Sequence, residues 1–115
     1  MCPDRRRKTG LHGEDIAADY LVRKGYKILH RNLRLSHLEI DLICRDGDCL
    51  VFIEVKTSRG EKYGHPATWI DDKKQEKLHR AAQMFIEREA IEGLDIRFDA
   101  VTILRGEIEH FINAF

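Results

Sequence analysis

The sequence predicts an α/β domain in which helices cover a mixed β-sheet, with the element order α-β-β-β-α-β-β. Two alternating apolar and polar runs, residues 39–45 and 48–56, flank Asp46-Gly47, which is typical of a β-hairpin. A long amphipathic stretch separates that hairpin from another β-branched run, which is typical of a β-α-β unit. A chain of 115 residues is long enough for one hydrophobic core but not for two, so we expect a single folded domain.

The first helix is expected from about Leu11 to Lys24. It ends before Gly25, because glycine readily adopts the left-handed conformation of a helix C-cap. Its apolar stripe consists of Ile16, Ala17, Tyr20 and Leu21. Residues 26–33, with β-branched and aromatic side chains, then form the first strand.

The hairpin register follows from its turn. With Asp46-Gly47 as the central dipeptide of a type I′ turn, Glu39 lies opposite Glu54 and Cys44 lies opposite Cys49. One face then carries four charged side chains, those of Glu39, Asp41, Glu54 and Lys56. The other face is apolar and consists of Ile40, Leu42, Cys44, Val51, Ile53 and Val55. A slip by one residue would mix the two sets, so the core pattern supports this assignment of faces.

The second half of the chain supplies the other helix and two more strands. After a loop over residues 57–70, Asp71 or Asp72 caps a helix that runs to about Glu89. Its buried face consists of Leu78, Ala81, Ala82 and Phe85. Strands over residues 96–104 and 108–112 follow, and the first of them is expected to lie parallel to the second hairpin strand through a right-handed crossover. We expect the first helix to lie on the same side of the sheet as the charged hairpin face.

The charged hairpin face is the candidate site. Glu39, Asp41 and Glu54 repel one another there, and a divalent cation would turn that repulsion into coordination. Lys56 emerges on the same face and could orient or deprotonate a water beside the metal. Glu14 begins the core-facing edge of the first helix, or is simply a first-turn carboxylate favoured by the helix dipole. The alternative is that the hairpin charges form a solvated edge.

Positive charge is concentrated in two places, although the formal net charge is zero. Neutrality argues against strong non-specific nucleic-acid binding, so any affinity must come from local clusters. One cluster lies in a flexible arm over residues 1–9 and consists of Arg5, Arg6, Arg7 and Lys8. The other lies on the second helix and consists of Lys73, Lys77 and Arg80, with Lys74 near the helix start. Each cluster could contact phosphates, and the alternative for each is a solvated surface.

The composition predicts a cytoplasmic protein without a membrane segment. No apolar run approaches the ~20 residues that span a bilayer, and no apolar stretch follows the basic start as in a secretory signal. In the cytoplasm the cysteines are most simply reduced core thiols, with a Cys44–Cys49 cross-strand disulfide as the alternative. The cysteine and histidine spacings match no zinc motif, so we assign no zinc site.

From residue 10 to 115 the chain resembles the YraN-like family of bacterial proteins, and its element order resembles the PD-(D/E)XK, or restriction-endonuclease-like, superfamily. The matching segments include Gly13-Glu14, Gly25-Tyr26, Arg31-Asn32, residues 39–43, residues 51–56, Lys74, Ala81-Ala82, residues 97–99 and residues 113–115. The resemblance implies a single three-layer α/β/α domain with a nuclease-like fold over residues 10–115.

The resemblance also implies residue roles. Asp41 and Glu54 correspond to metal-binding and catalytic carboxylates, and Lys56 to the catalytic lysine. Glu14 resembles the helix-borne acid of the Holliday-junction-resolvase branch, and Glu39 is an additional acid at the metal. The implied function is a Mg²⁺- or Mn²⁺-dependent endonuclease that hydrolyses phosphodiester bonds in branched or damaged DNA. The alternative is a non-catalytic nucleic-acid-binding or adaptor module with the same fold, and a homodimer stays open for either.

Overall fold

The computed structural model describes residues 5–58 and 64–115, without the side chains of residues 5–12 and 67. In chain order its elements are α1 (Arg5–Arg23), β1 (Lys27–Leu35), β2 (Leu38–Asp46), β3 (Cys49–Ser58), the short 3₁₀ helix η1 (Pro66–Thr68), α2 (Asp72–Arg88), β4 (Asp95–Leu104) and β5 (Glu107–Phe111). The predicted order α-β-β-β-α-β-β is therefore confirmed. None of the described helices has the length and apolar character needed to cross a membrane.

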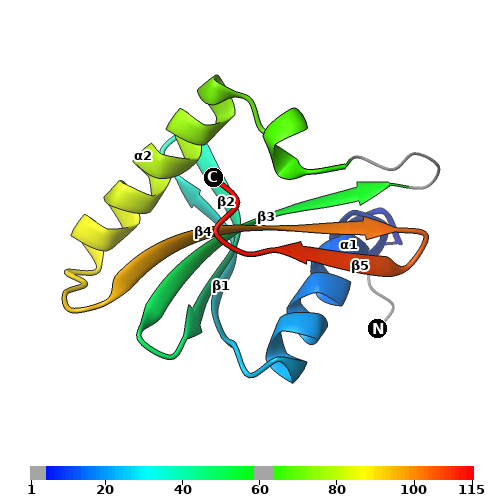
Figure 1. The fold of residues 1–115 in the computed structure, drawn as a ribbon, viewed down its shortest axis with the longest axis horizontal. Helices are drawn as coiled ribbons and strands as arrows, with labels where there is room; N and C mark the ends of the chain where they lie inside the picture. The colour runs from blue at the N-terminus through cyan, green and yellow to red at the C-terminus, as the bar shows by residue number, and fades with distance from the viewer. Residues whose placement is uncertain (1–4, 59–63) are drawn as a thin grey trace.

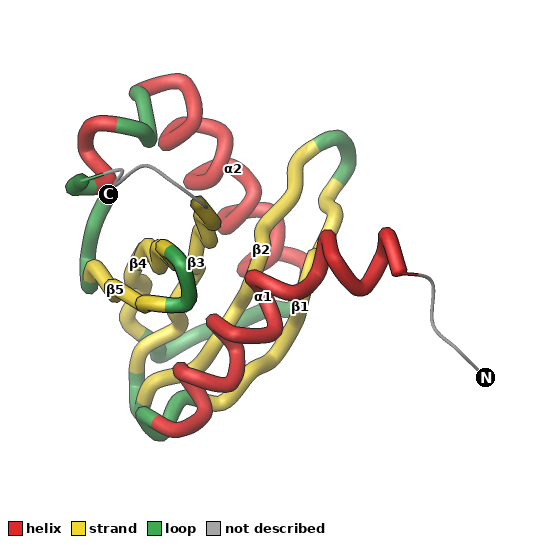
Figure 2. The backbone as a smooth tube through the Cα atoms, turned by 90° about the vertical axis from the view of Figure 1, so that its right-hand side faces the viewer, coloured by secondary structure: helices red, strands yellow, loops and turns green. Residues whose placement is uncertain are grey.

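The five strands form one mixed sheet with a helix on each face. The strand order is β1-β2-β3-β4-β5, in which β3 and β4 are parallel and the other neighbours are antiparallel. Figures 1 and 2 show α1 and α2 on opposite sides of these strands. The predicted parallel β-α-β unit is confirmed, with α2 as the crossover between β3 and β4.

Helix α1 starts earlier than expected but ends as predicted. Its backbone includes residues 5–9, which belong to the predicted flexible arm; residues 1–4 of that arm lie outside the described residues. At its end Gly25 has a φ of 98°, and its N–H donates to the Val22 carbonyl at 3.0 Å. The N–H of Tyr26 donates to the Leu21 carbonyl at 2.9 Å, which completes a Schellman motif.

The predicted hairpin register was wrong by two residues. Asp46 pairs with Cys49, so the turn residues are Gly47 and Asp48 rather than Asp46 and Gly47. Gly47, with a φ of 59°, takes the first central position, which is the glycine position of a type II′ turn. Asp46 remains in the strand, where its carboxylate forms an ion pair with Arg97 at 3.2 Å. A shift of two residues preserves the alternation, so Leu42, Cys44, Val51 and Ile53 stay together on one face as predicted.

The new register separates the cysteines and changes the opposing pairs of the charged face. Cys44 pairs with Val51, and both Cys44 and Cys49 are free thiols. Burial raises the pKa of the Cys44 thiol to about 12, so it remains protonated at neutral pH. Leu42 pairs with Ile53, and continuing the ladder by one residue places Asp41, rather than Glu39, opposite Glu54. The two acids expected to lie diagonally therefore lie side by side.

The prediction that α1 lies on the charged side of the hairpin was wrong. The apolar stripe of α1 packs with one buried cluster, which includes Ala17, Leu21, Leu42, Cys44, Val51 and Ile53. Helix α2 packs with the other face through a cluster that includes Ile43, Leu50, Phe52, Ala81, Ala82 and Phe85. Ile40, which we expected on the α1 side, belongs to the α2 cluster. Because α1 buries its apolar stripe, it packs against the apolar hairpin face. Helix α2 therefore covers the face with Asp41 and Glu54.

Candidate functional site

Asp41 and Glu54 form a carboxylate pair between β2 and β3. Both point to the α2 side of the sheet, because they alternate with the buried Ile43 and Phe52 along their strands. The Val55 N–H donates to Asp41 Oδ2 at 2.9 Å, and this hydrogen bond fixes the position of the Asp41 carboxylate. Glu54 is only 8% exposed, so this is a desolvated pair rather than two surface charges.

The surroundings of the pair favour the protonated form of Asp41. Burial, followed by repulsion from Glu54, raises the pKa of Asp41 to about 8, although the Val55 N–H acts in the opposite direction. A hydrogen bond between the Asp41 and Glu54 side chains and the nearby Glu14 charge raise it further. A nearby cation stabilises the ionised form of a carboxyl group. A carboxyl group that is protonated near neutral pH can therefore lose its proton when a cation binds.

Glu14 lies close enough to this pair to act on it electrostatically. Its own pKa is raised, mainly by burial, while a hydrogen bond from the Asn32 side chain and the Arg31 charge oppose the shift. Its Oε1 atom is buried and has no hydrogen-bond partner. An unsatisfied buried carboxylate oxygen is costly, so Glu14 retains an unused ligand position beside the Asp41–Glu54 pair.

Glu39 does not join the pair directly. Its side chain is 47% exposed and forms an ion pair with Arg34 at 3.5 Å. The β2–β3 pairs run from Asp46–Cys49 to Leu42–Ile53 and do not include Glu39. Its negative charge still raises the pKa of Glu14, so it contributes to the field of the site.

Two lysines approach the pair from different elements. Lys56 is half-buried on the same face of β3, two residues beyond Glu54. Lys74, in the first turn of α2, places Nζ 2.6 Å from Glu54 Oε2. That hydrogen bond raises the pKa of the Lys74 ammonium, with Asp41 adding to the effect. We expected Lys74 to contact nucleic acid, and in the structure it neutralises a site carboxylate.

The donor set has the chemistry of a Mg²⁺ or Mn²⁺ site. No three histidine, cysteine, aspartate or glutamate side chains among the described residues are arranged to hold a metal ion. Mg²⁺, however, is usually bound by one or two carboxylates together with waters and substrate phosphate oxygens. Asp41 and Glu54 meet that requirement, and Glu14 acts on them through its charge.

The basic stripe on α2 points outward from the domain. Lys73, Lys77 and Arg80 are exposed, and Arg80 lies 3.6 Å from Glu76 on the same helix. The helix backbone is fixed at its start by Asp71, whose carboxylate accepts from the Lys74 N–H at 2.8 Å. The side chains of Arg5, Arg6 and Arg7 lie outside the described residues, although their backbone belongs to α1.

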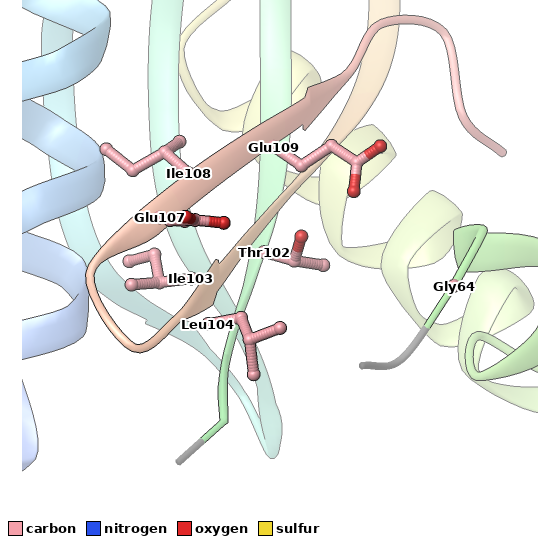
Figure 3. A pocket seen from close by; sticks show the side chains of 7 residues that line it. All are labelled: Gly64, Thr102, Ile103, Leu104, Glu107, Ile108 and Glu109. Atoms are coloured by element: carbon pink, nitrogen blue, oxygen red, sulfur yellow. The ribbon is translucent and has the colours of Figure 1, made fainter. Parts of the chain in front are cut away.

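A pocket of about 240 Å³ adjoins the strand that carries Lys56. It is lined by Gly64 and by side chains of the β4–β5 hairpin, and Figure 3 shows Thr102, Leu104 and Glu109 extending toward Gly64. Thr102 pairs with Lys56 in the β3–β4 ladder and with Glu109 in the β4–β5 ladder. The pocket therefore continues the face on which Glu54 and Lys56 lie.

A second charged group lies inside the protein, and the sequence patterns did not single it out. Asp99 is completely buried, and Arg97 donates to both of its carboxylate oxygens at 2.9 Å. His110 Nε2 and the Asn113 N–H contact the same carboxylate at 2.8 and 2.9 Å. Because Lys24 Nζ can only donate, its 3.1 Å contact makes His110 Nδ1 the acceptor and Nε2 the protonated nitrogen. A buried Asp in a strand pattern was the signal that could have revealed this group.

Comparison with known proteins shows the family. The model of the Uncharacterised protein family UPF0102 matches residues 13–103. The chain belongs to the UPF0102 family. Relatives within UPF0102 include a protein from Syntrophotalea carbinolica, 42% identical over 96% of this chain and 94% of that protein. A second from Syntrophomonas wolfei is 42% identical over 95% and 98% of the two chains. The predicted YraN-like resemblance is thereby confirmed.

The UPF0102 match includes the whole candidate site, from Glu14 through Asp41, Glu54 and Lys56 to Lys74. Among solved structures, Pyrococcus furiosus SfsA in complex with Ca²⁺ aligns with a TM-score of 0.33 and 15% identity, over 95% of this chain and 64% of that one. A likeness at that level carries no argument about the UPF0102 site. The chemistry of the site therefore has to be argued from its own side chains.

Proposed function

We propose that this UPF0102 protein is a Mg²⁺- or Mn²⁺-dependent endonuclease that hydrolyses phosphodiester bonds in branched or damaged DNA. The observation that carries the proposal is the desolvated Asp41–Glu54 pair, in which burial and repulsion from Glu54 raise the pKa of Asp41. Two carboxylates on adjacent strands with a lysine two residues further on also match the superfamily pattern that the sequence resembles. We place the enzyme in the cytoplasm, where a bacterial chromosome would be its substrate.

Each residue of the site has a separate role in the proposed reaction. Asp41 and Glu54 hold the cation, and Glu14 adds its unpartnered oxygen. The bound metal supplies an activated water and neutralises charge that develops on the phosphate. Lys56 orients that water or stabilises the developing charge from the same face of β3. The Val55 N–H keeps the Asp41 carboxylate in place through its 2.9 Å hydrogen bond.

DNA contacts come from the exposed cations around this face. The chain has no net charge, so binding relies on the stripe of Lys73, Lys77 and Arg80 and on the Arg5-Arg6-Arg7 segment. The site itself is acidic and repels phosphate until a cation is bound. The proposal therefore includes stronger DNA binding in the presence of Mg²⁺ or Ca²⁺, and a homodimer would double the number of contacts.

One observation favours the alternative of a non-catalytic nucleic-acid-binding module. Lys74 already neutralises Glu54, so the face is stable without metal. Such a module would bind DNA through the same stripe without cleaving it. Cleavage with added metal separates the two functions.

The test is a cleavage assay with Mg²⁺ or Mn²⁺ on duplex, flap, fork and four-way-junction DNA. We expect the wild-type protein to cut at least one branched substrate and Lys56→Ala to lose about 10²-fold or more in rate. Lys27→Ala, an exposed change at the start of β1, is the matched control and should retain the wild-type rate. Metal-dependent cleavage that survives Lys56→Ala and Asp41→Asn/Glu54→Gln would be incompatible with this site. DNA binding without cleavage would favour the alternative.

A further inference from the structure

Lys74 occupies an unusual place for a lysine on an amphipathic helix. It lies four residues before Leu78, which is 6% exposed and belongs to the packed face of α2. Ile70, four residues before Lys74, is 1% exposed and packs with Leu78 over Ala100 of β4. Lys74 thus continues the helix row that includes Leu78, although its own side chain is 50% exposed.

The side chain of Lys74 ends on the least exposed acid of the site. Its Nζ is 2.6 Å from Glu54 Oε2, and the Glu54 side chain is 10% exposed. Ala100 pairs with Glu54 in the β3–β4 ladder, and its small side chain leaves room for the first turn of α2 above Glu54. The Asp71 cap holds the backbone of that turn through the Lys74 N–H. The ion pair is therefore positioned by three elements, β3, β4 and α2.

We propose that Lys74 is the internal counter-ion of the metal site and that a divalent cation displaces it from Glu54. This inference rests on the proposed function, since it assumes that Asp41 and Glu54 bind the cation. The Glu54 oxygen that contacts the ammonium is the donor that the cation needs. An ammonium and a dication on one carboxylate pair repel each other at close range. The two cations therefore compete for Glu54.

Displacement is sterically inexpensive and has a consequence for the substrate. The Lys74 side chain is 50% exposed, so its flexible stem can turn toward solvent without unpacking the helix. Once released, the ammonium lies beside a bound cation, where a phosphate oxygen would be attracted. Without metal, Lys74 thus positions the Glu54 carboxylate. With metal bound, Lys74 contacts a phosphate of the substrate.

The first experiment measures Mn²⁺ affinity by calorimetry at fixed salt for the wild type, Lys74→Met and Lys77→Met. Lys77→Met removes one positive charge from the next turn of the same helix and reports the long-range effect alone. We expect Lys74→Met to bind Mn²⁺ about tenfold more tightly than the wild type, and Lys77→Met to stay within about twofold. Equal or weaker binding by Lys74→Met, with binding by the wild type intact, overturns the competition and leaves the proposed metal site standing.

The second experiment uses the wild-type protein, so it does not depend on how a variant folds. Lysine acylation is followed by mass spectrometry at increasing Mn²⁺, and we expect Lys74 to react faster as the site fills while Lys77 is unchanged. Unchanged or slower labelling of Lys74 at saturation overturns displacement. Absence of Mn²⁺ binding by both the wild type and Lys74→Met, or binding that persists in Asp41→Asn/Glu54→Gln, overturns this inference together with the metal site.

Discussion

Asp41 and Asp99 are both withdrawn from water, lie on opposite faces of the same sheet and have opposite pKa shifts. Burial alone would raise the pKa of Asp99, but hydrogen bonds from His110, Arg97 and the Asn113 amide outweigh it and lower the pKa. Asp41 receives one backbone N–H and faces Glu54 and Glu14, so its pKa rises to about 8. The comparison shows that partners, more than burial, decide whether a buried carboxylate is charged.

The difference also separates a structural role from a functional one. Arg97 links Asp99 to Asp46 at 3.2 Å and to the Tyr26 hydroxyl at 2.6 Å, so this cluster ties the α1–β1 connection to the end of β2 and to β4. Both Asp99 oxygens there accept hydrogen bonds from positioned donors. The Asp41–Glu54 pair has more negative charge than its neighbours compensate. That deficit is where a cation would bind.

The largest effect is expected from breaking the satisfied cluster. Asp99→Asn removes the buried charged partner of Arg97 and leaves the mostly buried guanidinium with Asp46 alone, which should cost about 3–5 kcal/mol of unfolding free energy. Urea denaturation measures the loss, with Asp95→Asn, an exposed change on the same strand, as the control within about 0.5 kcal/mol. A loss as small as that of the control would mean that the cluster does not hold the strands together.

The next-largest effect is expected from adding a divalent cation to the Asp41–Glu54 pair. At a free Mn²⁺ concentration 100 times Kd, mass action should stabilise the folded protein by about 2.7 kcal/mol. Thermal unfolding with and without Mn²⁺ measures this, and Asp41→Asn/Glu54→Gln should abolish the response. The double variant Glu92→Gln/Asp95→Asn removes two exposed acids instead and should respond like the wild type. Equal shifts in all three proteins would place the metal elsewhere.

Asp41→Asn should change how stability depends on pH. The pKa of Asp41 is raised in the folded state, so its contribution is fully present below the unfolded pKa near 4 and is lost as pH rises through about 8. Without metal, we therefore expect Asp41→Asn to gain about 2 kcal/mol relative to the wild type between pH 6.5 and pH 9. Denaturation at both pH values measures the gain. A difference that is constant with pH would contradict the raised pKa.

The smallest effect on unfolding free energy is expected from removing the Tyr26 hydroxyl at the edge of the Asp99 cluster. Tyr26→Phe removes the hydroxyl that contacts Arg97 and should cost about 0.5–1.5 kcal/mol. Tyr20→Phe is the control, because the Tyr20 ring packs edge-on against His110 and that contact survives the change. Urea denaturation compares the two. Equal costs would show that the Arg97–Tyr26 hydrogen bond adds nothing to the packing of the ring.

The sequence by itself determined the element order, the faces of the hairpin and the Gly25 cap, because each depends on local periodicity or on one residue's backbone freedom. Side-chain alternation has a period of two, so the faces of the paired residues were right although the register was wrong by two residues; Ile40, beyond those pairs, lies on the other side. The choice between Asp46-Gly47 and Gly47-Asp48 as the turn was not local, since Asp46 is held in its strand by Arg97, 51 residues away.

Only the tertiary structure decided which acids meet and what neutralises them. The sequence placed Asp41, Glu54 and Lys56 on one face, but their direct pairing, the exposure of Glu39 and the contact of Lys74 with Glu54 depend on how α2 crosses the sheet. In a β-α-β unit the helix returns antiparallel to its strands, so its first turn lies over the last residues of the strand before it. That geometry brings Lys74 onto Glu54 and leaves the acid pair with the charge deficit from which the function is proposed.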